Sequence, residues 1–131
     1  MFSTSKERFL LKLGWGEELN LKKIPFLLVK NVRSSLTEAC SNFYKKKPRN
    51  IIAVTGTNGK SSVADFFYQI LNINKVPAAS IGTLGILSKS YKKKTNLTSM
   101  DPISLHKNLE ILAKNKIDHV ILEASSHGLE Q

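Results

Sequence analysis

Hydrophobic residues recur along this chain with two kinds of spacing. Residues 51–54 (IIAV) and 119–123 (HVILE) are short apolar runs, typical of strands in a parallel sheet covered on both faces. Residues 60–71 instead place Val63, Phe66, Phe67, Ile70 and Leu71 three and four positions apart, as one apolar stripe of a helix. Strands that alternate with helices predict an α/β fold, with a parallel sheet flanked by helices.

Further elements follow from the same pattern. Residues 5–13 could form a short helix, 26–29 read as a strand, and 78–87 are strand-like but interrupted by Gly82 and Gly85. A helix is expected over residues 34–44. Its predicted apolar face consists of Leu36, Ala39, Cys40 and Phe43.

The Asp101-Pro102 pair predicts the start of another helix. An aspartate accepts hydrogen bonds from unpaired amide groups, and proline at the first helical position loses none. Leu105, Leu109 and Leu112 then form the predicted inner face of this helix.

Composition limits the class of protein. A chain of 131 residues with 41% hydrophobic residues can build the core of one ordinary domain. No apolar run approaches the roughly 18 residues of a membrane span, and the N-terminus does not read as a signal peptide. The single cysteine, Cys40, excludes an internal disulfide and fits a reducing compartment. We therefore expect a cytoplasmic protein without a membrane partner.

The chain is strongly basic, with a formal net charge of +10. Lysines 45–47 and 92–94 form short runs, whereas arginine, the side chain that most often reads bases, is scarce. We favour solvated loops over a nucleic-acid surface. Such a field would also attract anionic phosphates.

The clearest chemical motif lies in IIAVTGTNGKSSVADFFYQIL, residues 51–71. Gly59-Lys60-Ser61 matches the end of the general phosphate-loop pattern, but Val54 occupies its first glycine position and Gly56 falls two places later. Glycines between a strand and a helix let backbone N–H groups approach phosphates. Lys60 would reach the β- and γ-phosphates, and Ser61 would ligate Mg²⁺. The alternative is a tight glycine turn with an exposed Lys60; nucleotide binding is the favoured interpretation.

Four motifs in order resemble the Mur ligases, the ATP-dependent amino-acid ligases of peptidoglycan precursor synthesis. They are TGTNGKSS (55–62), AASIGTLG (78–85), LTSMDPISLHKNLEIL (97–112) and ILEASSHGLEQ (121–131). Together they are most similar to the branch that adds the third amino acid, the UDP-N-acetylmuramoyl-tripeptide synthetases. The related folylpolyglutamate synthases share the loop but not the LTS-DP or SSHGL segments.

The resemblance implies a role for each matching residue. Lys60 would be catalytic, and Ser61 and Glu123 would ligate Mg²⁺, although Glu123 could also be a plain strand-end carboxylate. Thr98, Ser99, Ser125 and Gln131 would contact the UDP-MurNAc-dipeptide substrate, although serine and threonine also cap helices. Met100 departs from the family, which often has proline there. The residues implied to hold ATP phosphates are Gly56, Thr57, Asn58, Gly59, Lys60, Ser61 and Ser62.

Members of the family have three domains, of which the resemblance covers a part. Residues 1–48 would be a remnant of the N-terminal UDP-binding domain and linker, and residues 49–131 the first part of the central ATP-binding domain. The C-terminal domain would be absent, so the chain would be inactive alone unless a second polypeptide completes it. The strand at residues 121–122 and its neighbours would then present unpaired edges or an uncovered face.

Other functions are open to the same residues. A stand-alone nucleotide-binding module would use the same loop, and a folylpolyglutamate synthase-like fragment is a further alternative. A serine hydrolase built on His127 and Ser125 or Ser126 is disfavoured, since there is no nucleophile-elbow motif. A histidine metal site at His106 or His119 is also disfavoured, because neither has a second ligand at metal spacing.

Overall fold

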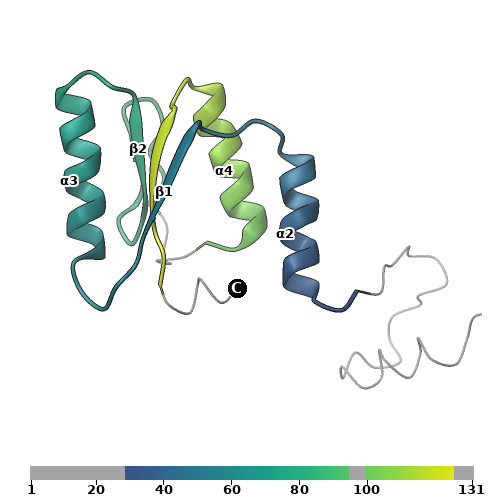
Figure 1. Ribbon diagram of the computed structural model, residues 1–131. Helices are drawn as coiled ribbons and strands as arrows, with labels where there is room; N and C mark the ends of the chain where they lie inside the picture. Colours follow the sequence, from purple (N-terminus) through teal and green to yellow (C-terminus); the bar gives the residue numbers. More distant parts are fainter. Residues whose placement is uncertain (1–28, 95–99, 126–131) are drawn as a thin grey trace, which may run out of the picture. The chain divides into compact units, whose positions relative to one another are not determined.

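The computed structural model describes residues 29–94 and 100–125, and the described residues from Arg33 onward belong to one compact unit (Figure 1). The helix expected at 5–13 and nearly all of the strand expected at 26–29 lie outside the described residues. The elements are α2 (Val32–Phe43), β1 (Asn50–Val54), α3 (Lys60–Ile73), β2 (Ala78–Gly82), β3 (Gly85–Ser88), α4 (Pro102–Lys114) and β4 (His119–Glu123).

The strands form one mixed sheet in the order β1-β4-β2-β3. β4 pairs in parallel with both β1 and β2, as predicted, with Ile52 opposite Ile121 and Ser80 also opposite Ile121. β3 is antiparallel to β2, so the strand-like stretch expected over 78–87, with its interruption at Gly82 and Gly85, is a hairpin of two strands. The chain reverses at Thr83 and Leu84, and Gly85 takes a φ of +94°, which a residue with a side chain rarely adopts.

Two helices cover the two faces of the sheet, α3 on one side and α4 on the other (Figure 1). The prediction for α4 is confirmed: Leu109 and Leu112 are buried, and Leu105 packs against the core. Asp101 caps the helix as expected, because its side chain accepts a hydrogen bond of 2.9 Å from the Ser104 amide. The core cluster consists of Ala79, Ile81, Ile86, Leu109, Leu112, Ile117 and Val120.

The apolar stripe of α3 is wider than the surface that it covers. Ala64 is buried, while Val63, Phe66 and Ile70 are half or more exposed. Helix periodicity predicts which residues share a face, but it does not say how much sheet lies under that face. The stripe therefore continues past the described part of the sheet.

The predicted apolar face of α2 is mostly wrong. Cys40 is buried as expected, but Leu36 and Ala39 are exposed and Phe43 is 78% exposed, with its ring edge-on to Tyr44. The spacing of these residues is helical, yet only the side at Cys40 is covered.

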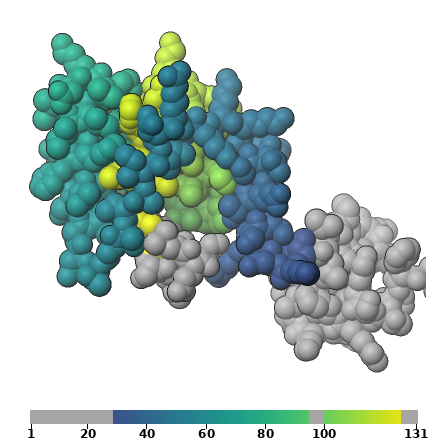
Figure 2. All heavy atoms as spheres, viewed as in Figure 1, coloured from purple at the N-terminus to yellow at the C-terminus, as the bar shows by residue number. Residues whose placement is uncertain are grey.

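The expectation that the strand at residues 121–122 and its neighbours would present unpaired edges or an uncovered face is confirmed for one neighbour, but not for that strand itself. β4 lies inside the sheet, and Val120 and Ile121 are buried. In the sheet that the described residues form, an edge strand is its neighbour β1, where Ile51 and Ile52 are 40% and 44% exposed. In the space-filling view, the blue atoms of the β1 segment lie on the visible surface (Figure 2). Within the described residues, no helix has the length and apolar character needed to cross a membrane.

Candidate functional site

The carboxyl ends of three strands meet at one edge of the sheet. Val54, the last residue of β1, pairs with Glu123, the last residue of β4, and the Ala124 amide donates to the Val54 carbonyl at 2.9 Å. The turn after β2 brings Thr83 to the same edge. Ligands of open α/β sheets bind at this edge.

The loop after β1 has the backbone that its glycines permit. Gly56 has a φ of +144° and Gly59 a φ of +81°, so both lie in the region that favours glycine. Gly59 is also the N-cap of α3 and provides no side-chain hydrogen bond. The amide groups of the first helical turn are therefore left to water or to a bound anion, at the positive end of the helix dipole.

Lys60 lies over this loop. Its ammonium donates hydrogen bonds to the carbonyl oxygens of Gly56 at 2.7 Å and Thr57 at 3.3 Å. Two neutral carbonyl acceptors thus hold the positive charge of Lys60 against the loop. Phosphate oxygens would replace them with stronger, charge-assisted partners.

Glu123 is the buried charged group of the site, with 5% of its surface exposed. Its Oε2 accepts hydrogen bonds from Ser61 Oγ at 2.7 Å and Thr83 Oγ1 at 3.1 Å. Its Oε1 accepts from the Thr83 amide at 3.2 Å. No lysine or arginine in the described part of the chain forms an ion pair with it. A buried carboxylate whose hydrogen-bond donors are neutral is costly, and a bound cation would offset that cost.

The donor set at this point fits a magnesium ion. Mg²⁺ prefers oxygen ligands at about 2.1 Å and keeps several waters or phosphate oxygens, so one carboxylate and one hydroxyl suffice. Two adjacent octahedral ligands at that distance lie about 3 Å apart, and the Ser61 and Glu123 oxygens are 2.7 Å apart. The described residues contain no group of three His, Cys, Asp or Glu side chains that could hold a metal by themselves.

These groups surround a cavity of about 250 Å³. It brings together most of the predicted phosphate-binding residues and both predicted metal ligands; Gly56 takes part through its carbonyl group. The lining residues are Thr57, Asn58, Gly59, Lys60, Ser61, Ser62, Thr83 and Glu123.

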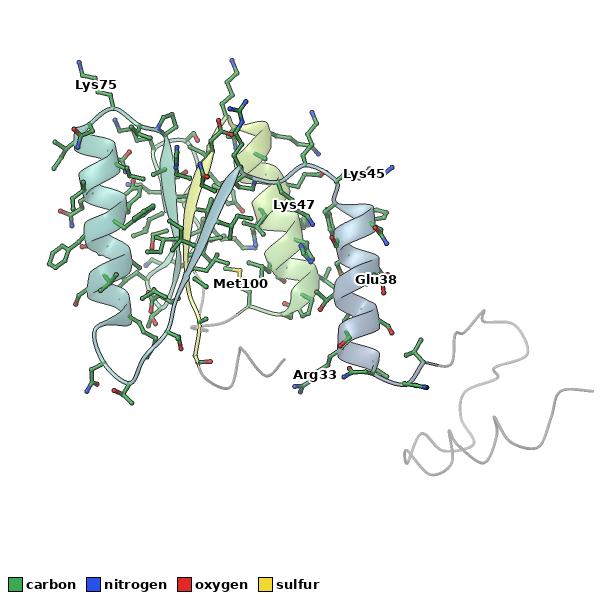
Figure 3. The ribbon with its side chains drawn as sticks, in the orientation of Figure 1. Arg33, Glu38, Lys45, Lys47, Lys75 and Met100 are labelled. Atoms are coloured by element: carbon green, nitrogen blue, oxygen red, sulfur yellow. The ribbon has the colours of Figure 1, made fainter. Side chains whose placement is uncertain are left out.

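The four predicted substrate contacts are not placed in this cavity. Thr98, Ser99 and Gln131 lie outside the described residues, and Ser125 is described but is not among the residues that line the cavity. Met100, the departure from the family pattern, lies beside α4, where the Asn108 amide contacts its sulfur at 3.6 Å (Figure 3).

Thr83 is the residue of the site that the sequence did not predict. It lies in the GTLG turn, and its contact to Glu123 spans 40 residues of sequence. The sequence did contain a signal for Thr83: it is a threonine at the end of a predicted strand. That strand was expected to be parallel to the strand that precedes the glycine loop. The antiparallel hairpin that positions it was not foreseen.

Comparison with known proteins identifies the family. The Mur ligase middle domain matches residues 54–131, so the chain belongs to the Mur ligase family, whose members are ATP-dependent. Its relatives within that family are MurE-type ligases, as the sequence motifs predicted.

Two curated relatives and one solved structure show the extent of the similarity. The UDP-N-acetylmuramoyl-L-alanyl-D-glutamate--2,6-diaminopimelate ligase of Bradyrhizobium diazoefficiens is 44% identical over 83% of this chain and 22% of its own length. The ligase of the same name from Rickettsia montanensis is 46% identical over 80% and 23%. A solved structure of a ligase of that name matches with a TM-score of 0.60 and 34% identity, over 72% of this chain and 19% of the other. The chain thus spans about a fifth of the relatives that it matches.

Proposed function

We propose that this chain is the ATP-binding portion of a UDP-N-acetylmuramoyl-tripeptide synthetase. The observation that carries the proposal is the pairing of Ser61, in the glycine loop, with Glu123, at the end of β4, 62 residues away. Both side chains line the same cavity as Lys60, which supports the proposal. The names of the relatives support the class of reaction and 2,6-diaminopimelate as the third amino acid. The cytoplasm is the compartment that this function implies.

In this proposal each residue of the loop has a role in holding Mg²⁺-ATP. The amide groups at the start of α3 would bind phosphate oxygens, and Lys60 would move from the Gly56 carbonyl to the β- and γ-phosphates. Ser61 and Glu123 would hold Mg²⁺, which supplies charge neutralisation during phosphoryl transfer to the dipeptide carboxylate. Thr98, Ser99, Ser125 and Gln131 remain the proposed contacts to the UDP-MurNAc-dipeptide.

We propose further that residues 1–131 do not ligate by themselves. Residues 1–48 would be the remnant of the UDP-binding domain and linker, and residues 49–131 the first part of the ATP-binding domain. Phosphoryl transfer depends on exact positioning of both substrates, and this chain spans 22% of a relative that performs the whole reaction. Transfer of radiolabelled diaminopimelate into the tripeptide product by the purified chain would contradict this proposal.

A thermal melt with and without Mg²⁺-ATP tests the proposed nucleotide binding. A ligand at 100 times its Kd adds about 2.7 kcal/mol of stability, a shift of several degrees for a domain of this size. The shift should disappear in Lys60→Ala. It should persist in Lys107→Ala, which removes the same charge from the exposed side of α4. Equal shifts in melting temperature in both variants would mean that ATP is attracted only by the net positive charge of the chain.

A further inference from the structure

Among the described residues, Thr83 donates hydrogen bonds to both oxygens of the Glu123 carboxylate. Its amide donates to Oε1 at 3.2 Å and its hydroxyl donates to Oε2 at 3.1 Å. The last torsion of a glutamate side chain is broad and has no strong intrinsic preference. Two donors from one residue of the turn, one on each oxygen, therefore set the rotation of this carboxylate.

Ser61 cannot fix the carboxylate in the same way. It donates a single hydrogen bond, to Oε2 only, and it is itself a proposed ligand of the ion. Its hydroxyl geometry must adjust when a cation is bound. Thr83 is not a proposed ligand of the ion, so its hydroxyl does not have to turn away from Glu123 when a cation binds.

The backbone next to Thr83 is shaped around the same carboxylate. A Cβ atom at Gly82 would overlap the Glu123 carboxyl group. The end of β2 can therefore approach Glu123 closely enough for the following amide and hydroxyl to reach it. Gly82 permits the contact, and Thr83 makes it.

We propose that Thr83 is a positioning residue for the magnesium site: it orients Glu123 so that one carboxylate oxygen faces the ion beside Ser61. The proposal rests on the proposed Mg²⁺-ATP binding and adds a residue to it. Partners that orient a metal ligand contribute about 10- to 100-fold to metal affinity when they are removed. The hydroxyl of Thr83 should have an effect in that range.

The test is calorimetric titration of ATP into the whole chain, once with saturating Mg²⁺ and once with EDTA. The ratio of the two affinities measures the contribution of the ion. Thr83→Val removes the hydroxyl and keeps the shape and the amide; Thr83→Ser restores the hydroxyl. Leu84→Ala is the control for disturbance of the turn, because Leu84 is 59% exposed and adjacent.

We expect Thr83→Val to lower the Mg²⁺-dependent ratio about tenfold or more, with the affinity in EDTA unchanged. Thr83→Ser and Leu84→Ala should keep the wild-type ratio. If Thr83→Val does not melt cooperatively, Thr83→Ala removes the same hydroxyl with a smaller side chain and carries the same expectation.

Two results would overturn the inference while the proposed function stands. One is an unchanged ratio in a folded Thr83→Val. The other is an equal loss with Mg²⁺ and with EDTA, which would make Thr83 a direct phosphate contact. Wild-type chain that binds no ATP, or a Lys60→Ala variant that binds it equally well, would overturn the proposed function and this inference together.

Discussion

At the residue scale, the described part of the site depends on contacts between segments far apart in the sequence. Glu123 ends one strand, Ser61 begins a helix, and Gly82 ends a second strand beside the carboxylate. Each of these residues has an ordinary local conformation. Their role depends on proximity: Ser61 lies within hydrogen-bond distance of Glu123, and Gly82 leaves space for the Glu123 carboxylate.

Gly82→Ala should destabilise the chain, since the added methyl group overlaps the buried Glu123 carboxylate. Overpacking of this kind costs about 1–3 kcal/mol, which urea unfolding can measure. In a Glu123→Ala background the overlap is gone, so the same substitution should cost clearly less. An equal cost in both backgrounds would show that the carboxylate is not what excludes a side chain at position 82.

Asp101→Ala should cost about 1 kcal/mol of stability through the lost cap of α4. Hydrogen bonds from Ser104 lower the pKa of the Asp101 carboxyl below its ordinary value. The contribution of Asp101 to folding stability is therefore present above about pH 3.9. It is lost as the pH falls through the lowered pKa of the folded state. Asp101→Asn keeps an acceptor for the cap without the charge. It should retain most of the stability and lose this part of the acid dependence; an Asn variant as weak as Ala would contradict the capping account.

Local residues of the site were predictable, and distant partners were not. Lys60, Ser61 and the Asp101 cap follow from short motifs whose physics is contained in a few neighbouring residues. Glu123 was predicted through the family resemblance and its position at a strand end. Thr83 escaped, because its partner is 40 positions away and the hairpin that places it is a tertiary feature.

At the element scale, α2 and α4 meet around His106. Burial lowers the pKa of the His106 imidazole, the nearby Lys47 lowers it further, and a hydrogen bond with the Thr37 backbone acts in the opposite direction. The Nδ1 atom of the ring is buried and has no hydrogen-bond partner in the described residues. Figure 3 shows Lys47 beside α4. Glu110, one turn further along, has its pKa lowered first by Lys114, which donates at 2.6 Å, and then by Lys46.

This contact should make stability fall in mild acid. The unfolded chain takes up a proton on His106 near pH 6.5, whereas the folded chain resists protonation until a lower pH. Stability is therefore full above that value and declines as the pH falls toward the lowered folded pKa. Urea midpoints between pH 7.5 and 5 should show the decline in wild type and a flatter profile in His106→Gln. Identical profiles would exclude His106 as its source.

The exposed edge strand β1 should promote self-association. Its isoleucines are 40% and 44% exposed, and within the described sheet only one of its sides pairs with another strand, so an apolar edge faces outward. Ile52→Lys should raise the soluble monomer fraction, measured by sedimentation velocity, with little change in the melting temperature. Ile121→Lys, on the adjacent interior strand, should instead abolish the cooperative melt. Unchanged self-association in Ile52→Lys would show that the chains do not associate through β1.

The sequence predicted the type of each described helix and parallel strand, and it predicted the covered face of α4 but not those of α2 and α3. The spacing of three and four predicts a helix at residues 60–71 whatever its tertiary surroundings are. Whether Phe66 or Ala64 is buried depends on where the sheet ends, and that information is not local. The same reason explains why most of the predicted apolar face of α2 is exposed.

At the scale of the whole molecule, the described chain brings together a glycine loop, the helix that follows it and a strand-end carboxylate. These parts fall between residues 54 and 123, within the stretch that matches the Mur ligase middle domain. The chain spans about a fifth of its relatives. Our central claim for the described residues is Mg²⁺-ATP binding at this one site.

Equilibrium dialysis of labelled Mg²⁺-ATP against wild type, Lys60→Ala and Lys107→Ala, at low and physiological salt, tests that claim most directly. The account predicts one ATP per chain for wild type and Lys107→Ala at both salt concentrations, and at least a tenfold weaker affinity for Lys60→Ala, since a charge-assisted phosphate contact contributes about 1.5–3 kcal/mol. Binding that is equal in all three proteins and vanishes at physiological salt would contradict it, because only the net positive field of the chain would then hold the nucleotide.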